Sequence, residues 1–345
     1  MVTQIPGMSG SGWATASPAL AGRPQRIRIP EGFGWGGQPI QILWRPGVSV
    51  TYSLRLPKIE VPKVAFHVSA LGNDNNTGRR HSPLLTMGRA RSLLQGTGGG
   101  TIVLDGSTVK GWGNISLTVP VRILGNGSTV IRPTSFGVER VLWFGNNYHM
   151  SDLTIEGGEV LAVGTGIVGI TEDCVFRNSP RSGIEHNGSY SQYYVLRCES
   201  HNHKSDGFSY MSYPLDTPVW GFEAYSSAHD NGDPLGGSSD QGSTTHAGVR
   251  VIRLGCDYRN NNINVCDVGT TNNLMVECIG EVSKNNTVNL CVGGAVGNST
   301  ETWVYGGSFR GGAYYDIQVF EGSALYTTLD LAGYSIAPDS PIFPL

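Results

Sequence analysis

The sequence predicts an all-β chain wound as a parallel β-helix, a solenoid in which each coil is one repeat. Three observations predict it: a recurring Cys position, a second apolar run at a nearly constant distance behind it, and an Asn at a constant offset. The Cys position recurs between residues 166 and 320 at Cys174, Cys198, Ala224, Cys256, Cys278 and Gly307. The second run starts ten residues later, at Ile184, Phe208, Cys266, Val288 and Ile317. Asn follows the Cys by four residues at Asn178, Asn202 and Asn260.

The spacing of these copies favours stacked coils over other repeats. The period varies from 22 to 32 residues while the distance inside a copy stays fixed, as expected when core positions align and turns change length freely. A leucine-rich repeat requires a Leu/Asn ladder that is absent here. A helical repeat requires apolar residues three and four apart, whereas runs such as residues 248–253 alternate or are β-branched.

Composition sets the class of protein and excludes several partners. The 345 residues include 49 Gly and only 15% charged residues, which predicts many turns and a large buried core. A net charge of −3 gives no sign of nucleic-acid binding. No apolar run approaches about 20 residues, so we expect no membrane span. Residues 1–7 have neither a basic start nor an apolar stretch, so we expect no secretory signal. The six Cys lack a CxxC pair, and we expect buried thiols rather than disulfides or zinc.

Residues 1–62 differ from the rest of the chain. They are rich in Gly and Pro, and short alternating runs within them predict half-buried antiparallel strands. The first two dozen residues are too rich in small residues to build a core alone. We therefore interpret residues 1–62 as an attachment region that docks onto something larger.

Residues 63–110 are expected to form the entry to the solenoid. A strand at 64–69 and a turn at 73–78 precede Thr86, which can cap a short helix over 87–94 that covers the open end of the first coil. Residues 111–323 supply the coils, with early strands near 115–119, 121–124, 130–132, 141–144 and 153–156. Residues 324–345 form a last strand and a Pro-rich tail, which must cover the other open end unless a neighbouring subunit does.

This pattern resembles the right-handed β-helix (pectate-lyase-like) superfamily, in which Cys and Asn ladders stack from coil to coil. The order of strand, turn, helix and strand over 64–104 looks like the amino-terminal cap of phage tailspikes and capsule depolymerases. The resemblance covers about residues 64–320. It implies a homotrimeric virion protein that binds a bacterial surface polysaccharide and attaches to other virion proteins through its amino-terminal region. No active-site motif of the family is spelled out, so no catalytic residue is transferred.

Titratable residues gather where the repeat is broken, between Ala224 and Cys256. Stacked coils can present two carboxylates on either side of a glycosidic bond, as glycan hydrolysis requires. A lyase instead requires a basic group and an Arg that neutralises the sugar carboxylate. The candidate catalytic residues are Asp206, Asp230, Asp240 and His246. The candidate substrate-binding residues are His201, His203, Lys204, Arg250 and Tyr210.

Each of these residues also has a structural explanation. Asp206–Gly207 matches Ser182–Gly183 in the repeat, and residues 230–233 have the composition of a turn. Residues 240–246 could supply ligands to a divalent cation, but they lack a fixed ligand spacing, and we expect no cofactor and no metal.

Three functions remain open at this point. The first is a tailspike-like virion protein that binds a bacterial polysaccharide, with or without degrading it as a hydrolase or lyase. The second is a structural or receptor-binding virion spike without catalytic turnover. The third is a free bacterial polysaccharide lyase or hydrolase.

Overall fold

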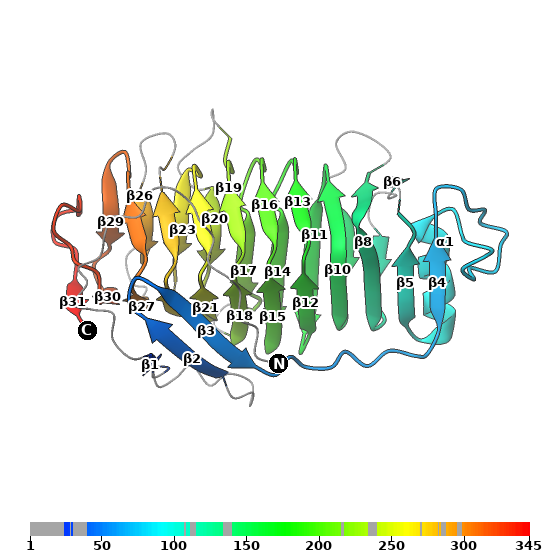
Figure 1. Ribbon diagram of the computed structural model, residues 1–345, viewed down its shortest axis with the longest axis horizontal. Helices are drawn as coiled ribbons and strands as arrows, with labels where there is room; N and C mark the ends of the chain where they lie inside the picture. Colours follow the sequence, from blue (N-terminus) through cyan, green and yellow to red (C-terminus); the bar gives the residue numbers. More distant parts are fainter. Residues whose placement is uncertain are drawn as a thin grey trace.

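The computed structural model describes residues 24–27, 29, 40–106, 108–110, 115–133, 140–214, 217–233, 240–269, 271–281, 283, 288–294 and 299–345. The chain winds into a column of coils whose strands are stacked in parallel along the long axis (Figure 1). It is an all-β, right-handed parallel β-helix, as the sequence predicts, and the described residues include one helix.

One wall of the column is a nine-stranded parallel sheet. Its strands are β7 (Ile115–Leu117), β9 (Arg140–Phe144), β11 (Glu159–Thr165), β14 (Ile184–Ser189), β17 (Phe208–Ser212), β20 (Gln241–Thr245), β23 (Ile263–Asp267), β26 (Val288–Val292) and β29 (Tyr315–Val319).

The other wall, which we call the bent sheet, turns a corner inside each coil. It begins with β4 (Ala65–Val68), β5 (Gly100–Leu104), β6 (Thr108–Lys110), β8 (Val121–Arg132) and β10 (Tyr148–Glu156). Each later coil has a longer strand before the corner: β12 (Val168–Glu172), β15 (Ser191–Leu196), β18 (Val219–Ala224), β21 (Val249–Leu254), β24 (Asn272–Val276), β27 (Glu301–Tyr305) and β30 (Ala324–Thr327). A short strand follows it: β13 (Val175–Arg177), β16 (Glu199–His201), β19 (Ser227–His229), β22 (Asp257–Arg259), β25 (Ile279–Glu281) and β28 (Ser308–Arg310).

The corners explain the Cys and Asn ladders. The residue before each Cys position adopts a left-handed backbone, as at Asp173 (φ 54°) and Arg197 (φ 52°), and this turns the strand. The predicted Asn positions lie at the next corner, where Asn178 and Asn202 both have φ 58°. Asn tolerates this conformation better than most residues, so the ladder marks the places where the chain must turn.

Three details of the predicted repeat are wrong. Leu196 pairs with Ala224, so the Cys position of that coil is Ser226, whose hydroxyl accepts a hydrogen bond from the Cys198 amide at 3.1 Å. The same coil also has a second run, β20, which was not expected. The column that begins at Ile184 and Phe208 continues through Ser243, Val265, Leu290 and Ile317 rather than through Cys266 and Val288.

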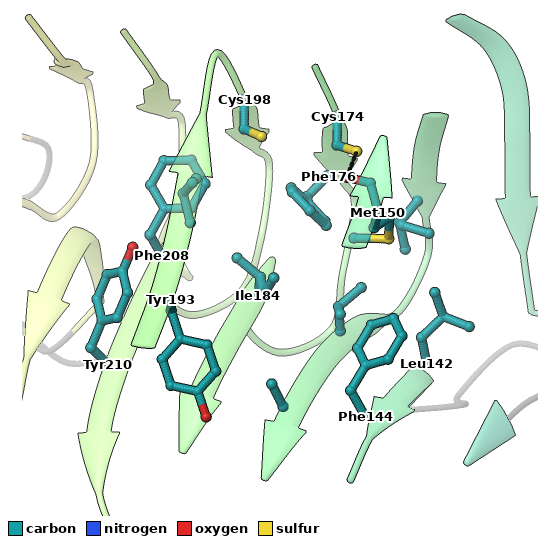
Figure 2. Close-up of a cluster of buried hydrophobic side chains, with 14 of the residues drawn as sticks. Leu142, Phe144, Met150, Cys174, Phe176, Ile184, Tyr193, Cys198, Phe208 and Tyr210 are labelled. Atoms are coloured by element: carbon teal, nitrogen blue, oxygen red, sulfur yellow. Dashed lines mark hydrogen bonds between the residues drawn. The ribbon is translucent and has the colours of Figure 1, made fainter. Parts of the chain in front are cut away.

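The core fills the inside of the column. Figure 2 shows Met150, Cys174, Phe176, Ile184 and Phe208 pointing into the space between the two walls. The Cys174 thiol donates to the Met150 carbonyl at 3.7 Å, one coil earlier. All six Cys are free and buried, as the sequence predicts.

The single helix described, α1 (Met87–Thr97), lies at the first coils and packs against β4, β5 and β7 (Figure 1). The Thr86 hydroxyl accepts from the Arg89 amide at 3.1 Å and donates to Asp74, which confirms the predicted N-cap. The helix buries Met87, Ala90 and Leu94 over the end of the core. At the other end β31 (Ile342–Pro344) pairs with β30, so the tail covers the last coil as expected. Within the described part of the chain, this 11-residue helix is too short to cross a membrane.

The amino-terminal strands form an antiparallel sheet of β1 (Gln25–Ile27), β2 (Ile40–Arg45) and β3 (Ser49–Leu54). This sheet packs on the outer face of the bent sheet through a second core, in which Ile42 and Trp44 meet residues such as Phe222 and Leu254. The Trp44 indole donates to Glu277 at 2.6 Å. The strands are confirmed, and the described part of the region docks on the chain's own coils (Figure 1). Its attachment to a larger assembly stays a prediction, and residues 1–23 lie outside the described residues.

Candidate functional site

A groove lies on the outer face of the nine-stranded sheet, across β7, β9, β11 and β14. It has a volume of about 540 Å³. It is lined by Ser116, Arg140, Trp143, Leu161, Val163, Glu185 and Asn187. These residues come from four coils and lie far apart in the sequence, and the stacking of the coils is what brings them together.

The register of the sheet explains why they line one surface. Leu161 pairs with Trp143 on one side and with Glu185 on the other, so the three side chains form an outward column. Val163 pairs with Asn187 in the next outward column. The inward residues between them, such as Ala162, belong to the core. The alternation of a β-strand therefore gives the groove an apolar floor with polar groups on both sides.

Trp143 is the main aromatic surface of the groove. Its side chain is 40% exposed, although large apolar side chains are usually buried. Two further exposed aromatic residues, Tyr190 and Tyr213, follow β14 and β17 at the ends where Asn187 and Met211 lie. Exposed rings beside a polar groove are suited to stacking on flat, partly apolar ligands such as sugar rings.

Glu159 lies at one edge of the groove with its side chain fully buried. It accepts from Arg140 Nε at 3.1 Å, and Arg181 Nε lies 3.5 Å away. Burial and the Glu185 carboxylate raise the pKa of Glu159, and the two guanidinium groups oppose this shift. The net pKa is about 7. Its second oxygen, Oε1, is buried and has no hydrogen-bond partner among the described residues.

Glu185 is the carboxylate that faces the groove. Besides Glu159, it raises the pKa of Asp206 and of His246, which places it electrostatically between these three groups. The Asn187 side-chain amide donates to it at 3.5 Å. Glu185 is therefore the centre of a group of titratable side chains that spans β11, β14, β20 and the turn before β17.

Asp206 is buried in the turn before β17. It occupies the same place in its coil as Ser182, and its carboxylate accepts from the Gln241 amide at 2.9 Å. Burial raises the pKa of Asp206 to about 7, and the Asp240 and Glu185 carboxylates add to the shift. The following Gly207 allows the close approach of the next coil, because a Cβ there would lie 2.6 Å from the Gly242 carbonyl oxygen.

Of the other three predicted catalytic residues, Asp240 interacts electrostatically with Asp206 and His246 with Glu185, whereas Asp230 lies elsewhere. Asp240 contacts the Asn262 amide at 3.2 Å, and burial raises its pKa. Burial lowers the pKa of His246, which Glu185 partly offsets. Asp230 instead lies at a corner of the bent sheet (φ 57°), at the position that Asn202 occupies one coil earlier, and its carboxylate contacts the His229 ring at 2.8 Å. Residues 234–239 of the inserted loop lie outside the described residues.

The predicted substrate-binding residues are not brought together. His201 stacks on His229 at 5.0 Å on the bent sheet, and Arg250 lies on the outer face of β21. His203 is 3% exposed and bonds the Ser179 amide at 3.0 Å, whereas Lys204 is exposed.

Tyr210 lies inside the column and stacks on His186 with ring centroids 4.8 Å apart, so its fully buried ring offers no surface to a ligand. Among the described residues, no three His, Cys, Asp or Glu side chains are grouped to hold a metal ion.

Sequence reasoning did not select Arg140, Trp143, Glu159 or Glu185. They lie on regular strands, whereas functional residues are most often found in loops, so the sequence pattern favours the polar loop instead. The available signal was a charged or aromatic residue at an alternate position of an otherwise apolar strand, as Trp143 is in β9. That signal becomes specific only when the register shows which strands are neighbours.

No protein-family model matches the chain, and no curated protein matches it in sequence. Comparison with solved structures finds similar chains. Pectate lyase Pel9A is 15% identical with a TM-score of 0.50, covering 83% of this chain and 78% of that one. The Dettilon tailspike protein is 11% identical with a TM-score of 0.46, covering 81% and 68%. ORF18 of Geobacillus virus E2 is 9% identical with a TM-score of 0.44, covering 88% and 66%.

The likeness to pectate lyase Pel9A agrees with the sheet topology of this chain, which is a parallel β-helix. Identities this low show a shared fold only.

Proposed function

We propose that this protein binds a polysaccharide along the groove of the nine-stranded sheet. The observation that supports the proposal is the groove itself, in which the exposed Trp143 ring lies beside Leu161, with Glu185 and Asn187 on the far side. Sugar rings have apolar faces that stack on aromatic side chains and hydroxyl groups that require polar partners. An extended groove across several coils fits a chain of sugars better than a single small molecule.

The ligand in this proposal is a bacterial surface polysaccharide, and the protein is a spike on a virion. The cap over residues 64–104, which resembles that of tailspikes, supports this setting. In the same setting the amino-terminal region attaches to other virion proteins and the protein is a homotrimer. A molar mass of three chains by light scattering would support the trimer, and a mass of one chain would contradict it.

Cleavage of the bound polysaccharide is a second candidate function, supported by the electrostatic interaction between the Glu185 and Asp206 carboxyl groups. Glycoside hydrolysis requires one protonated and one ionised carboxyl group. Glu185 faces the groove, and the buried Asp206 has a pKa of about 7, high enough to keep a proton near neutral pH. A binding spike without turnover and a free polysaccharide lyase or hydrolase are the alternatives.

Purified protein should be incubated with capsule and lipopolysaccharide preparations from a panel of bacteria, measuring bound polymer and released reducing ends. We expect Trp143→Ala to lower affinity about tenfold, or about 1.4 kcal/mol, because a stacking surface is lost. Tyr314→Ala is the matched control, since Tyr314 is 63% exposed and lies outside the groove. Equal binding by both variants would refute the site.

Catalysis is tested separately. Glu185→Gln should abolish the release of reducing ends and leave binding measurable. Glu281→Gln, on the short strand β25, should leave both release and binding unchanged. Binding without release by the unmodified protein would establish a spike without turnover.

A further inference from the structure

The two Arg residues at the groove already have an anionic partner. Arg140 and Arg181 both contact the buried Glu159, at 3.1 and 3.5 Å. A guanidinium paired with a buried carboxylate is not available to a second carboxylate without leaving the first one uncompensated, which costs several kcal/mol. Arg140 and Glu185 line the groove together, so Glu159 and Glu185 between them balance the charge of Arg140 and Arg181.

The remaining titratable groups on this face are acidic or neutral. Glu185, Asp206 and Asp240 are carboxyl groups within electrostatic reach of one another. Burial lowers the pKa of His246, so this imidazole is uncharged at neutral pH and supplies no positive charge. Arg140 and Arg181 balance Glu159 and Glu185, so Asp206 and Asp240 make this face negative, increasingly so as Asp206 ionises above pH 7. The exposed Lys204 does not line the groove.

The unsatisfied polar atoms at the groove point to the same kind of ligand. Glu159 Oε1 and Asn187 Oδ1 are both buried and accept no hydrogen bond from the described residues. Asn187 Oδ1 is an acceptor at every pH, and Glu159 Oε1 is one when Glu159 is ionised, so each then requires a donor. The C6 hydroxyl of a neutral sugar is such a donor, whereas the C6 carboxylate of a uronate has lost it and offers acceptors only. Buried acceptors without partners cost free energy, which a donor-rich ligand would recover.

We infer that the groove takes a sugar chain without carboxylate groups and excludes chains of uronic acids. The inference rests on the proposed glycan-binding function and adds the class of sugar to it. A chain without carboxylates lacks the acidic C–H that elimination requires, so cleavage in this groove is hydrolysis. The bond between the anomeric carbon and the bridging oxygen breaks, a hydroxide from water bonds to the anomeric carbon, and the bridging oxygen takes a proton.

The test uses matched polymers that differ only in charge. Oligosaccharides of 1,4-linked galactan, 1,4-linked mannan and chitin, whose C6 hydroxyls are free, are each compared with the same polymer oxidised at C6 to the uronate, using the full chain and its Trp143→Ala variant. We expect at least one parent polymer to bind in a Trp143-dependent manner, and its oxidised form to bind at least about tenfold more weakly at low salt. The gap should narrow at about 0.5 M salt, because charge repulsion is screened.

The outcomes separate the two proposals. An oxidised polymer that binds as tightly as its parent, in a Trp143-dependent manner, overturns the inference and leaves the glycan-binding function intact. If no polymer of either kind depends on Trp143, the glycan-binding function fails and the inference with it.

Discussion

Replacing Arg253 by Met should destabilise the column more than any surface substitution, because Arg253 is a charge buried inside it. Its side chain has no exposed surface, and it donates to Asp267 at 2.9 Å and to Ser243 at 3.0 Å. Glu223, also fully buried, lies 3.8 Å away. Burial raises the pKa of Glu223, which Arg253 partly offsets. Removing the guanidinium leaves two carboxyl groups in a dry interior without a cation.

The expected loss in the free energy of unfolding is about 3–5 kcal/mol, the range for removing one partner of a buried ion pair. It is measured by urea unfolding monitored by circular dichroism. Arg250→Met is the matched control, because Arg250 lies on the same strand but on its outer face, and we expect a loss of no more than about 1 kcal/mol. The deficit of Arg253→Met should shrink as the pH falls, because protonation removes the uncompensated charges.

A loss below about 1 kcal/mol for Arg253→Met at neutral pH would refute this reasoning, since it would mean that the two carboxyl groups need no cation. A loss of the expected size that stays constant down to pH 4 would assign the effect to packing rather than to charge.

Three further substitutions test the site and the turns. Asp206 has a pKa of about 7 in the folded state and about 3.9 in the unfolded chain. Between these pH values the folded state binds an extra proton. The free energy of unfolding therefore falls as the pH rises through this window, by up to about 1.4 kcal/mol per pH unit. Asp206→Asn should remove the share of this pH dependence that belongs to Asp206 in unfolding experiments from pH 4 to 8, leaving the share of Glu159, and an unchanged slope would contradict the assignment. Asn202→Val should cost about 1–2 kcal/mol because φ is 58°, and Asn202→Gly much less; equal losses would exclude backbone strain as the cause. Thr86→Ala should cost about 1 kcal/mol by urea unfolding because the cap of α1 is lost, and no loss would show that Asp74 alone holds the helix end.

The sequence predicted the column because its signals are local to each coil. A left-handed corner restricts residue choice, so Asn178 and Asn202 recur at a fixed offset from Cys174 and Cys198. The assignment of Ala224 failed because Ser226 fills the Cys position with a hydroxyl that bonds the neighbouring backbone, a substitution that a search for thiols overlooks. The second run of this coil, β20, lies farther from the Cys position than in the other coils, because a long turn precedes it, so a search at the constant spacing does not find it.

The groove could not be predicted because it depends on register between coils. Trp143, Leu161 and Glu185 are neighbours only through the pairing of β9, β11 and β14, and turns of variable length separate them in the sequence. The polar composition of their turns points to Asp206 and Asp240 as candidates. They lie close to one another because the strands that follow them, β17 and β20, are adjacent, and Asp206 also interacts with Glu185. Asp230 has the same composition, but it lies at a corner of the bent sheet.

The most direct measurement is a crystal structure of this chain soaked with an oligosaccharide cut from a polymer that it binds. The account predicts sugar density over the Trp143 ring and within hydrogen-bond distance of Glu185 and Asn187, across β9, β11 and β14. Density along the bent sheet at His201 and His229, with the groove empty, would contradict it.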